Sequence, residues 1–153
     1  PKTKIVLSEP DVAPIVGSQH TQERNENGEP TVSHPHFQPH PIQGWTPDFI
    51  PLVLQEAIDK NLFDELLPVN GKDSIYWSKQ LATKEGIFTG VSGGASLAVA
   101  MDVAKNAKNG SVILAMLPDT GERYLSTPLF DDIETEMSTE EIELSKSTPG
   151  FQM

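Results

Sequence analysis

Gly86-Ile-Phe-Thr-Gly-Val-Ser-Gly-Gly-Ala95 is the stretch that decides the fold, because it passes from a turn straight into an alanine-rich segment. Its glycines allow a tight turn and let a ligand approach the main chain closely. A helix that begins here, and runs to about Lys108, directs unpaired N–H groups and its positive dipole end at whatever lies above it. Ser92 either caps this helix or presents its hydroxyl to a ligand.

Apolar patterning on either side of this stretch alternates between strands and helices. Short apolar runs predict strands at residues 4–8, 65–70 and 111–117. A short helix, interrupted at Pro14, is expected at about residues 10–18, and amphipathic segments predict helices at about residues 49–60 and 70–85. The third helix has Asn70 as its expected cap and Gly86 after its end. The third apolar run is continuous, as a strand covered on both faces should be. This alternation predicts an α/β layered fold.

Two regions differ from this pattern. Residues 19–44 hold four prolines and no hydrophobic period, so a long loop is expected there. From Asp131 to Glu143 the chain carries seven carboxylates and no basic residue. Within that stretch, Ser138-Thr-Glu-Glu141 has the spacing of a capping box and predicts one short helix. We therefore expect one α/β region over residues 1–130 and a solvated acidic tail over residues 131–153.

Composition narrows the classes of function. The chain has 153 residues, with 11 basic against 22 acidic side chains, a net charge of −11 and no cysteine. Such an acidic surface repels phosphate backbones, so nucleic-acid binding is not expected. The lack of cysteine excludes disulfides, thiol catalysis and thiolate metal sites. The longest apolar run is too short to cross a bilayer, and no secretory leader opens the sequence. These features predict a soluble, cytoplasmic protein.

Two stretches resemble familiar site patterns, one of metal ligands and one of a hydrolase nucleophile. His34, His36 and His40 lie in one proline-rich segment, but the prolines stiffen it and no nearby carboxylate completes a ligand set. An exposed loop, and no metal site, is therefore expected there. Gly90 to Gly94 has the Gly-x-Ser-x-Gly spacing of a hydrolase nucleophile elbow. Every histidine precedes Ser92, whereas the hydrolase order needs one late in the chain, so a hydrolase is not favoured.

Four stretches, in the same order along the chain, resemble the C-terminal half of the cysteine synthases. They are Ser8-Glu-Pro-Asp11, Ile42-Gln-Gly-Trp-Thr-Pro-Asp-Phe-Ile-Pro51, Glu85-Gly-Ile-Phe-Thr-Gly-Val-Ser-Gly-Gly-Ala-Ser96 and Val112-Ile-Leu-Ala-Met-Leu-Pro-Asp-Thr-Gly-Glu-Arg-Tyr-Leu-Ser-Thr127. Cysteine synthases, or O-acetylserine sulfhydrylases, are pyridoxal-phosphate enzymes that catalyse β-replacement. The resemblance implies a fold type II enzyme, similar to the tryptophan synthase β subunit, with a three-layer αβα fold of which this chain is an incomplete C-terminal part.

The resemblance also implies roles for individual residues. Ser92 occupies the position whose hydroxyl bonds the pyridine nitrogen of pyridoxal 5'-phosphate, which favours the ligand interpretation of this serine. Gly44 and Trp45 fall in the loop beside the mouth of the active site. None of the nine lysines has the context of the family's Schiff-base lysine, so no catalytic residue is expected in this chain. The chain also opens at Pro1 without an initiator methionine. We therefore expect an earlier part of the protein, and an inactive chain when it stands alone.

The implied activity of the complete enzyme is that of a transferase or lyase making L-cysteine from O-acetylserine and sulfide. Trp45 and Pro47 replace small residues at the mouth, which should favour sulfide over the larger homocysteine. A cystathionine β-synthase, which uses homocysteine, is the rival enzyme. A non-catalytic homologue or fragment acting as a binding module is the rival outside catalysis, and it could dock the C-terminal tail of serine acetyltransferase. A homodimer is expected, and the loop 19–40 is either a lid, an interface element or a passive surface loop.

Overall fold

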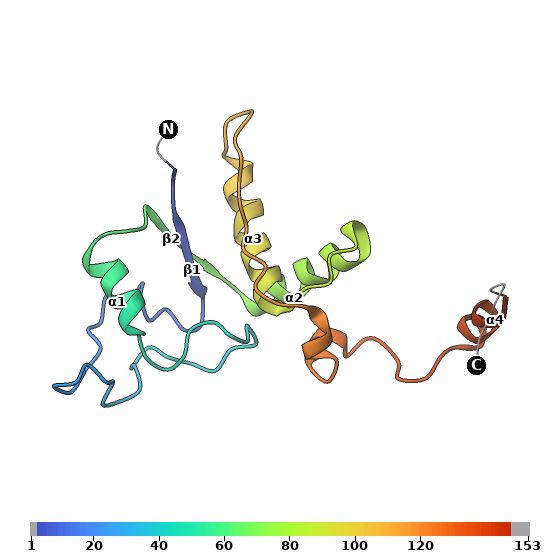
Figure 1. Ribbon diagram of the computed structural model, residues 1–153, viewed down its shortest axis with the longest axis horizontal. Helices are drawn as coiled ribbons and strands as arrows, with labels where there is room; N and C mark the ends of the chain where they lie inside the picture. Colours follow the sequence, from blue (N-terminus) through green and yellow to red (C-terminus); the bar gives the residue numbers. More distant parts are fainter. Residues whose placement is uncertain (1–2, 148–153) are drawn as a thin grey trace. The chain divides into compact units, whose positions relative to one another are not determined.

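Two short parallel strands, β1 (Val6–Pro10) and β2 (Glu65–Val69), pair with each other in the computed structural model, which describes residues 3–147 (Figure 1). The register runs from Val6 opposite Glu65 to Pro10 opposite Val69. Parallel neighbours require a long crossover connection, which is typical of α/β folds. The strands predicted at residues 4–8 and 65–70 are both present, although β1 lies two residues later than expected and includes Pro10 at its end. The N–H of Asp11 donates to the carbonyl of Val69 and continues the pairing.

The helix predicted at about residues 10–18 is wrong, because this segment forms successive turns. The physical reason lies in Glu9, whose carboxylate accepts the backbone N–H groups of Val16 and Gly17, each at 2.9 Å. Those two donors would otherwise bond helical carbonyls. Pro14, in the middle of the segment, has no N–H to contribute to a helix. A side chain therefore organises this part of the backbone.

The helices after the long loop begin and end at local signals. Helix α1 spans Leu52–Asp59 and follows Pro51, inside the range expected for it. Helix α2 spans Gly71–Gln80, and the side chain of Asn70 caps it by accepting the N–H of Asp73 at 2.8 Å. The chain continues as a π-helical turn, η1 (Leu81–Glu85), and stops at Gly86, whose φ is 68°. The expected cap and the terminating glycine are both confirmed.

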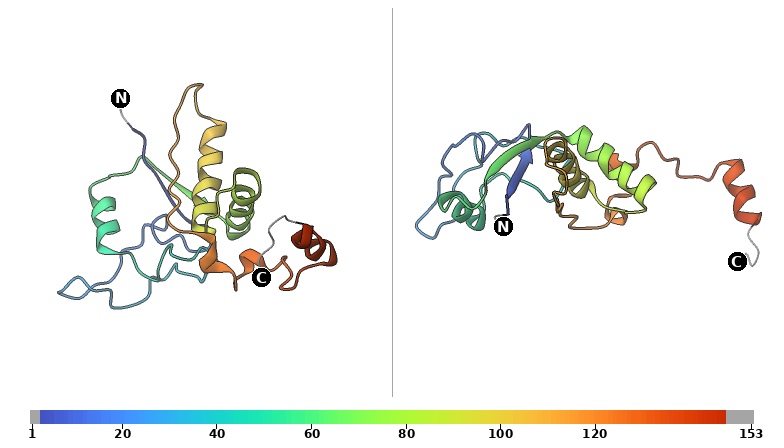
Figure 2. Two further views of the ribbon diagram at one scale, coloured as in Figure 1. Left: turned by 45° about the vertical axis from the view of Figure 1, so that its right-hand side comes forward. Right: turned by 90° about the horizontal axis from the view of Figure 1, so that it is seen from above.

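Helix α3 (Val91–Lys105) packs side by side with α2, as the views in Figures 1 and 2 show. Glycine makes this close approach possible. A Cβ added at Gly94 would lie 2.0 Å from the carbonyl oxygen of Ser74 and 2.6 Å from the amide nitrogen of Ser78. The residues buried around this contact are mostly small, namely Ser74, Ser78, Leu81, Val91, Ala95, Ala98 and Val99.

The strand predicted over residues 111–117 is not formed. After the turn at Asn109–Gly110 the chain runs back beside α3 as irregular backbone (Figures 1 and 2). Its apolar side chains are open to solvent, with Val112 96% and Leu114 91% exposed. A strand needs a neighbouring strand to satisfy its backbone groups, and no pairing of this run occurs among residues 3–147. Pairing resumes only at Thr120, which forms an isolated antiparallel bridge with Thr89.

Backbone contacts divide the chain into two units, Pro1–Arg123 and Tyr124–Met153. The short 3₁₀ turn η2 (Gly121–Tyr124) lies where they meet in sequence, and the second unit holds a further 3₁₀ turn and a helix, η3 (Pro128–Phe130) and α4 (Thr139–Ser147). The predicted capping box of α4 is confirmed: Glu141 accepts the N–H of Ser138 at 2.7 Å, and Ser138 Oγ accepts the N–H of Glu141. The rest of the predicted tail, residues 148–153, lies outside the described residues. Over the described part of the chain, no helix combines the length and apolarity needed to cross a bilayer.

Candidate functional site

Ser92 lies in the first turn of α3, one residue after the helix begins at Val91. Gly90 occupies the N-cap position in an extended conformation, and no side chain caps the helix. The capping interpretation of Ser92 is therefore wrong. Ser92 is only 2% exposed, and its hydroxyl makes no hydrogen bond within residues 3–147. A hydroxyl without a protein partner, on a buried residue beside uncapped helix N–H groups, is suited to binding an electron-rich ligand atom.

The backbone in front of Ser92 is held by a second buried residue, Thr89, which the sequence analysis did not single out. Ser78 of α2 donates its hydroxyl hydrogen to the Thr89 carbonyl at 2.8 Å, and Thr89 Oγ1 donates to the Asp119 carbonyl at 3.1 Å. The N–H of Gly121 donates to the carbonyl of Phe88. Two stretches that are about thirty residues apart in sequence therefore meet beside the start of α3. Only the threonine preceding Gly90 could have indicated this contact in the sequence.

Gly44 and Trp45 belong to the segment we call the mouth loop, residues 42–50. The loop turns sharply, because Gly44 has a φ of 86° and Thr46 a φ of 39°. The N–H of Trp45 donates to the carbonyl of Ile42 at 3.2 Å, and the indole is half-buried. Gly44 is exposed, and a Cβ added there would have nothing within 4 Å. Glycine at this position is therefore required by the turn and not by packing.

Helix α2 connects the mouth loop with the helix that carries Ser92. Pro41, just before the mouth loop, packs against Gly71 at the first residue of α2, where an added Cβ would lie 2.2 Å from Pro41 Cγ. One turn further along α2, the carbonyl of Ser74 meets Gly94. The predicted site residues Ser92 and Gly44 thus come from segments packed on neighbouring turns of one helix. No backbone hydrogen bond joins Ser92 and Gly44 in the described part of the chain.

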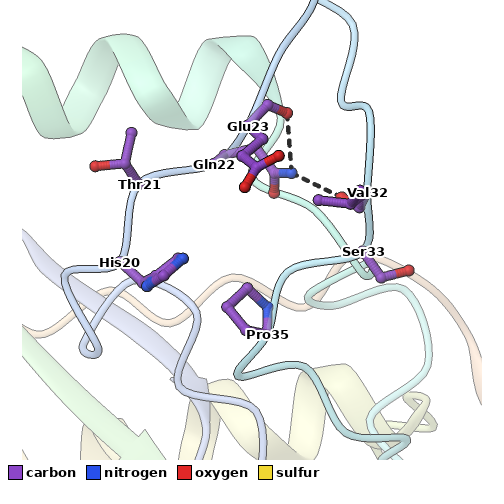
Figure 3. A pocket seen from close by; sticks show the side chains of 7 residues that line it. All are labelled: His20, Thr21, Gln22, Glu23, Val32, Ser33 and Pro35. Carbon is purple, nitrogen blue, oxygen red and sulfur yellow. Dashed lines mark hydrogen bonds between the residues drawn. The ribbon is translucent and has the colours of Figure 1, made fainter.

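The insertion loop, residues 19–40, is tied to the mouth loop by hydrogen bonds. Gln22 is buried, donates to the Val32 carbonyl at 2.9 Å and accepts the N–H of Ile50 at 3.2 Å. Arg24 donates to the carbonyl of Ile50, and the N–H of His34 donates to the carbonyl of Asp48 at 2.6 Å. Figure 3 shows Gln22 reaching across to Val32 at one side of a small pocket of about 190 Å³. The insertion loop lines this pocket with His20, Thr21, Gln22, Glu23, Val32, Ser33 and Pro35.

The rings of His20, His34 and His36 cluster, and the central one, His34, has both ring nitrogens engaged. The His34 ring lies 5.5 Å from that of His20 and 5.9 Å from that of His36, measured between centroids. His34 is buried, its Nε2 donates to the His20 carbonyl at 3.1 Å and its Nδ1 accepts the N–H of His36 at 3.3 Å. Both nitrogens are therefore used within the loop, which leaves no lone pair for a cation. Among the described residues, no group of three or more ligating side chains is arranged to hold a metal ion.

Glu9 is a buried carboxylate that the sequence marks only as part of the Ser8-Glu-Pro-Asp11 motif. Burial raises the pKa of Glu9 above its ordinary value of 4.5, and the N–H groups of Val16 and Gly17 partly oppose this shift, as does the nearby His34. The carboxylate fits tightly, because a Cβ added at Gly17 would lie 2.6 Å from Glu9 Oε1. Its two backbone partners make Glu9 an organiser of the turn after β1, which leads into the insertion loop.

Comparison of sequences shows what the chain is similar to. The family described as pyridoxal-phosphate dependent enzymes matches residues 1–119. O-ureido-L-serine synthase from Streptomyces lavendulae is 48% identical over 98 residues, which cover 64% of this chain and 29% of that protein. Cysteine synthase from Staphylococcus aureus is 35% identical over 134 residues, which cover 86% of this chain and 37% of that protein. The chain thus spans about a third of the length of these relatives.

Solved structures give the same result. The crystal structure of O-ureido-L-serine synthase matches with a TM-score of 0.70 and 36% identity, over 92% of this chain and 38% of that one. Cysteine synthase from Entamoeba histolytica matches with a TM-score of 0.65 and 27% identity, over 91% of this chain and 35% of that one. An O-acetylserine dependent cystathionine β-synthase from Helicobacter pylori matches with a TM-score of 0.62 and 27% identity, over 83% and 35% of the two chains.

Proposed function

This chain belongs to the family of pyridoxal-phosphate dependent enzymes, and from that premise we propose that it forms part of an enzyme that makes L-cysteine from O-acetylserine and sulfide. The predicted resemblance to cysteine synthases and the predicted α/β fold of a fold type II enzyme are confirmed by the relatives in sequence and structure. The family and its cysteine synthases depend on pyridoxal phosphate. The choice of substrates belongs to the proposal.

The observation that carries the proposal is the buried, uncapped start of α3. The Ser92 hydroxyl has no hydrogen-bond partner within residues 3–147 and is free to donate to a ring nitrogen. The residues therefore fit the pyridine end of pyridoxal phosphate. When bound, this cofactor supplies an electron sink that lets a substrate lose its α-proton and its β-substituent.

Ser92 and α3 also set the protonation of a nitrogen held there. A neutral hydroxyl donates a hydrogen bond without transferring a proton, and the N-terminal end of a helix carries about half a positive charge. A positive charge nearby disfavours protonation of a nitrogen. Both features keep the nitrogen neutral, which limits the electron sink and favours loss of a β-substituent over side reactions such as transamination. Thr89 and Ser78 hold the backbone that presents the hydroxyl.

The test is Ser92→Ala in the intact protein, with Ser96→Ala as the matched control one turn further along α3. We expect Ser92→Ala to change the absorbance of bound pyridoxal phosphate and to lower turnover, with far-ultraviolet circular dichroism and thermal midpoint unchanged. The Ser96→Ala variant should resemble the parent in all four measurements. A Ser92→Ala variant with parental absorbance and turnover would remove the basis for this assignment.

The mouth loop is expected to determine which nucleophile reacts, sulfide or the larger homocysteine. An indole at Trp45 takes up free volume and a proline at position 47 removes a backbone N–H that could bond a substrate. We expect sulfide to react much faster than homocysteine with O-acetylserine as the other substrate. The Trp45→Gly variant should improve the rate with homocysteine and hardly change the rate with sulfide. Faster turnover with homocysteine in the parent would favour a cystathionine β-synthase instead.

A second candidate is supported by the 48% identity to O-ureido-L-serine synthase. In this alternative the intact enzyme would join a small oxygen nucleophile bearing a ureido group to the β-carbon of an activated serine. Hydroxyurea is the probe that separates the two candidates, because it carries a hydroxyl on the ureido nitrogen. Mass spectrometry of products formed from O-acetylserine in equimolar sulfide and hydroxyurea decides which product predominates.

Our proposals on assembly and cellular location rest on the resemblance to the cysteine synthases. We propose a cytoplasmic homodimer whose cleft could also accept the C-terminal tail of serine acetyltransferase.

We propose further that residues 1–153 alone are inactive, since the Schiff-base lysine is expected elsewhere. Turnover by this chain expressed alone would contradict that. Borohydride reduction of the intact protein separates enzyme from binding module, because only a protein that holds the cofactor on a lysine gains a covalent, fluorescent adduct.

A further inference from the structure

Fewer contacts fix the middle of the mouth loop than fix its two ends. At one end Ile42 is buried, and at the other Asp48 and Ile50 are bound by the insertion loop through His34, Gln22 and Arg24. Between these anchors the chain passes through the half-buried Trp45 and Thr46. Whatever fixes the backbone at these two residues also fixes the direction of the indole.

Thr46 has a backbone conformation that it would not adopt unaided. Its φ of 39° lies in the left-handed region, although threonine is branched at Cβ. A non-glycine residue disfavours that region by roughly five- to thirty-fold relative to the right-handed one. Strain of this kind persists only where surrounding contacts over-determine it. A specific contact to Thr46 is therefore expected.

His40 supplies that contact. Its Nε2 lies 3.1 Å from the carbonyl oxygen of Thr46. A carbonyl can only accept, so Nε2 carries the hydrogen and the ring is held in one tautomer. The other nitrogen, Nδ1, is buried and has no partner in the described part of the chain. Burying an acceptor without a partner is unfavourable, so the ring is placed here for its bond to Thr46. The ring of Phe37 packs edge-on against it, 6.3 Å away between centroids.

We propose that His40 is a positioning residue for the mouth of the site: its bond to the Thr46 carbonyl holds the left-handed turn that directs the Trp45 indole. This inference rests on the proposed function, because the importance of the indole depends on the mouth loop lying at a substrate entrance. Losing the bond frees Thr46 to return to an ordinary conformation and turns the indole. One hydrogen bond corresponds to a roughly two- to tenfold change in the population of the held conformation.

The experiment uses the intact protein carrying Trp77→Phe, so that Trp45 is the one indole of this chain. His40→Ala removes the donor, and His40→Gln retains an N–H donor on a flexible side chain. Thr46→Gly removes the strain, because glycine adopts positive φ without penalty. Trp45 fluorescence emission and its quenching by iodide report the loop directly, whether or not the cofactor is bound. KM and kcat for O-acetylserine, measured separately, report how the mouth loop affects substrate entry and turnover.

We expect His40→Ala to raise iodide quenching of Trp45 and to raise KM about two- to tenfold with kcat within about twofold. His40→Gln should restore most of the parental quenching. In the Thr46→Gly background, His40→Ala should change iodide quenching and KM much less. Glycine adopts the positive φ without strain, so the hydrogen bond from His40 is no longer needed to maintain it. Parental quenching in His40→Ala, or an equal effect of His40→Ala in both backgrounds, would overturn the proposal.

The outcomes separate this proposal from the proposed function. Quenching that follows the expected pattern, with KM for O-acetylserine unchanged, overturns the role of His40 at a substrate entrance while leaving the loop contact intact. Failure of the proposed function itself is registered elsewhere, by parental cofactor absorbance in Ser92→Ala. A general loss of fold in His40→Ala would lower the thermal midpoint in both backgrounds alike. That result also counts against a local role.

Discussion

Gly94→Ala tests the contact on which the geometry of the site depends. The new methyl carbon would lie 2.0 Å from the carbonyl oxygen of Ser74 and 2.6 Å from the amide nitrogen of Ser78, whereas ordinary contact begins at 3.4 Å. Both atoms belong to the backbone of α2, so no side-chain rotation can relieve the overlap. Helix α3 must move away from α2 or the two helices must bend.

The expected change in unfolding free energy follows from two costs and one gain. Overpacking a well-packed interior costs about 1–3 kcal/mol, and a clash with backbone atoms belongs at the upper end of that range. Separating the helices by ~1 Å forfeits about a quarter to a half of the dispersion energy of the atoms that face each other. Replacing glycine by alanine inside a helix returns about 1 kcal/mol. We therefore expect a net loss of about 2 kcal/mol in the free energy of unfolding.

Urea unfolding of the intact protein measures this loss, with Trp45→Phe introduced so that Trp77 on α2 is the reporter. For a slope of about 2 kcal/mol per molar urea, the midpoint should fall by roughly 1 M. Gly110→Ala is the matched control, because a Cβ there meets nothing within 4 Å and only its φ of 85° is strained. It should leave the native emission of Trp77 unchanged. If Gly94→Ala were as stable as the parent with unchanged Trp77 emission, α3 would not approach α2 as described.

Three further outcomes are expected. The pKa of Glu9 is raised in the folded protein above its ordinary value of 4.5. The contribution of this side chain to stability is therefore fully present below pH 4.5 and is lost as the pH rises through the raised pKa. The unfolding free energy of the parent minus that of Glu9→Gln should therefore fall with rising pH, and a flat difference would contradict this. The backbone N–H and hydroxyl of Ser138 lower the pKa of Glu141, so α4 should lose helical Cα chemical shifts only as pH falls through that lowered value. Ser138→Ala should move this transition up towards pH 4.5. Leu114→Asp in the intact protein should cost about 2–5 kcal/mol, as at a core position, whereas less than about 0.5 kcal/mol would show that the 111–117 run stays exposed there.

Elements with short-range signals could be predicted from the sequence. Asn70 caps α2 by bonding a residue three positions away, and Gly86 ends the following turn with a positive φ. Ser138 and Glu141 bond each other across the first turn of α4. In each case the two partners lie within a few residues, so the pattern contains the whole interaction. Helix boundaries set by such pairs were found to within a few residues.

Elements that depend on distant partners could not be predicted in this way. The expected helix at 10–18 is replaced by turns because Glu9, a side chain of the preceding strand, takes two of its N–H groups. The insertion loop has no hydrophobic period, yet Gln22 binds it to Ile50, 28 residues away. Polar side chains that bond distant backbone groups leave no periodic trace. Prolines and polar residues indicated only that a loop was present.

In the candidate site too, features with local signals could be predicted and features that depend on distant partners could not. The glycines and the helix after Gly90 were visible in the sequence, but the local pattern left Ser92 open between cap and ligand. The resemblance favoured the ligand, and the observed N-cap at Gly90 removes the cap. The sequence presents His40 only as a candidate metal ligand in a histidine-rich loop. Its bond to Thr46 could not be foreseen, because a positive φ at threonine contradicts local preference and is decided by the surrounding fold.

The exposed run at 111–117 connects the fold with the proposed function. Local preference and apolar composition favour a strand there, and no strand pairs with it in the described part of the chain. A continuous apolar strand is stable only when neighbours pair with its edges and layers cover both faces. Immediately after this run come Thr120 and Gly121, which bond Thr89 and Phe88 in front of Ser92. We propose that whatever pairs with residues 111–117 in the intact enzyme also positions the backbone that presents Ser92, so that completing the sheet would complete the proposed cofactor site as well.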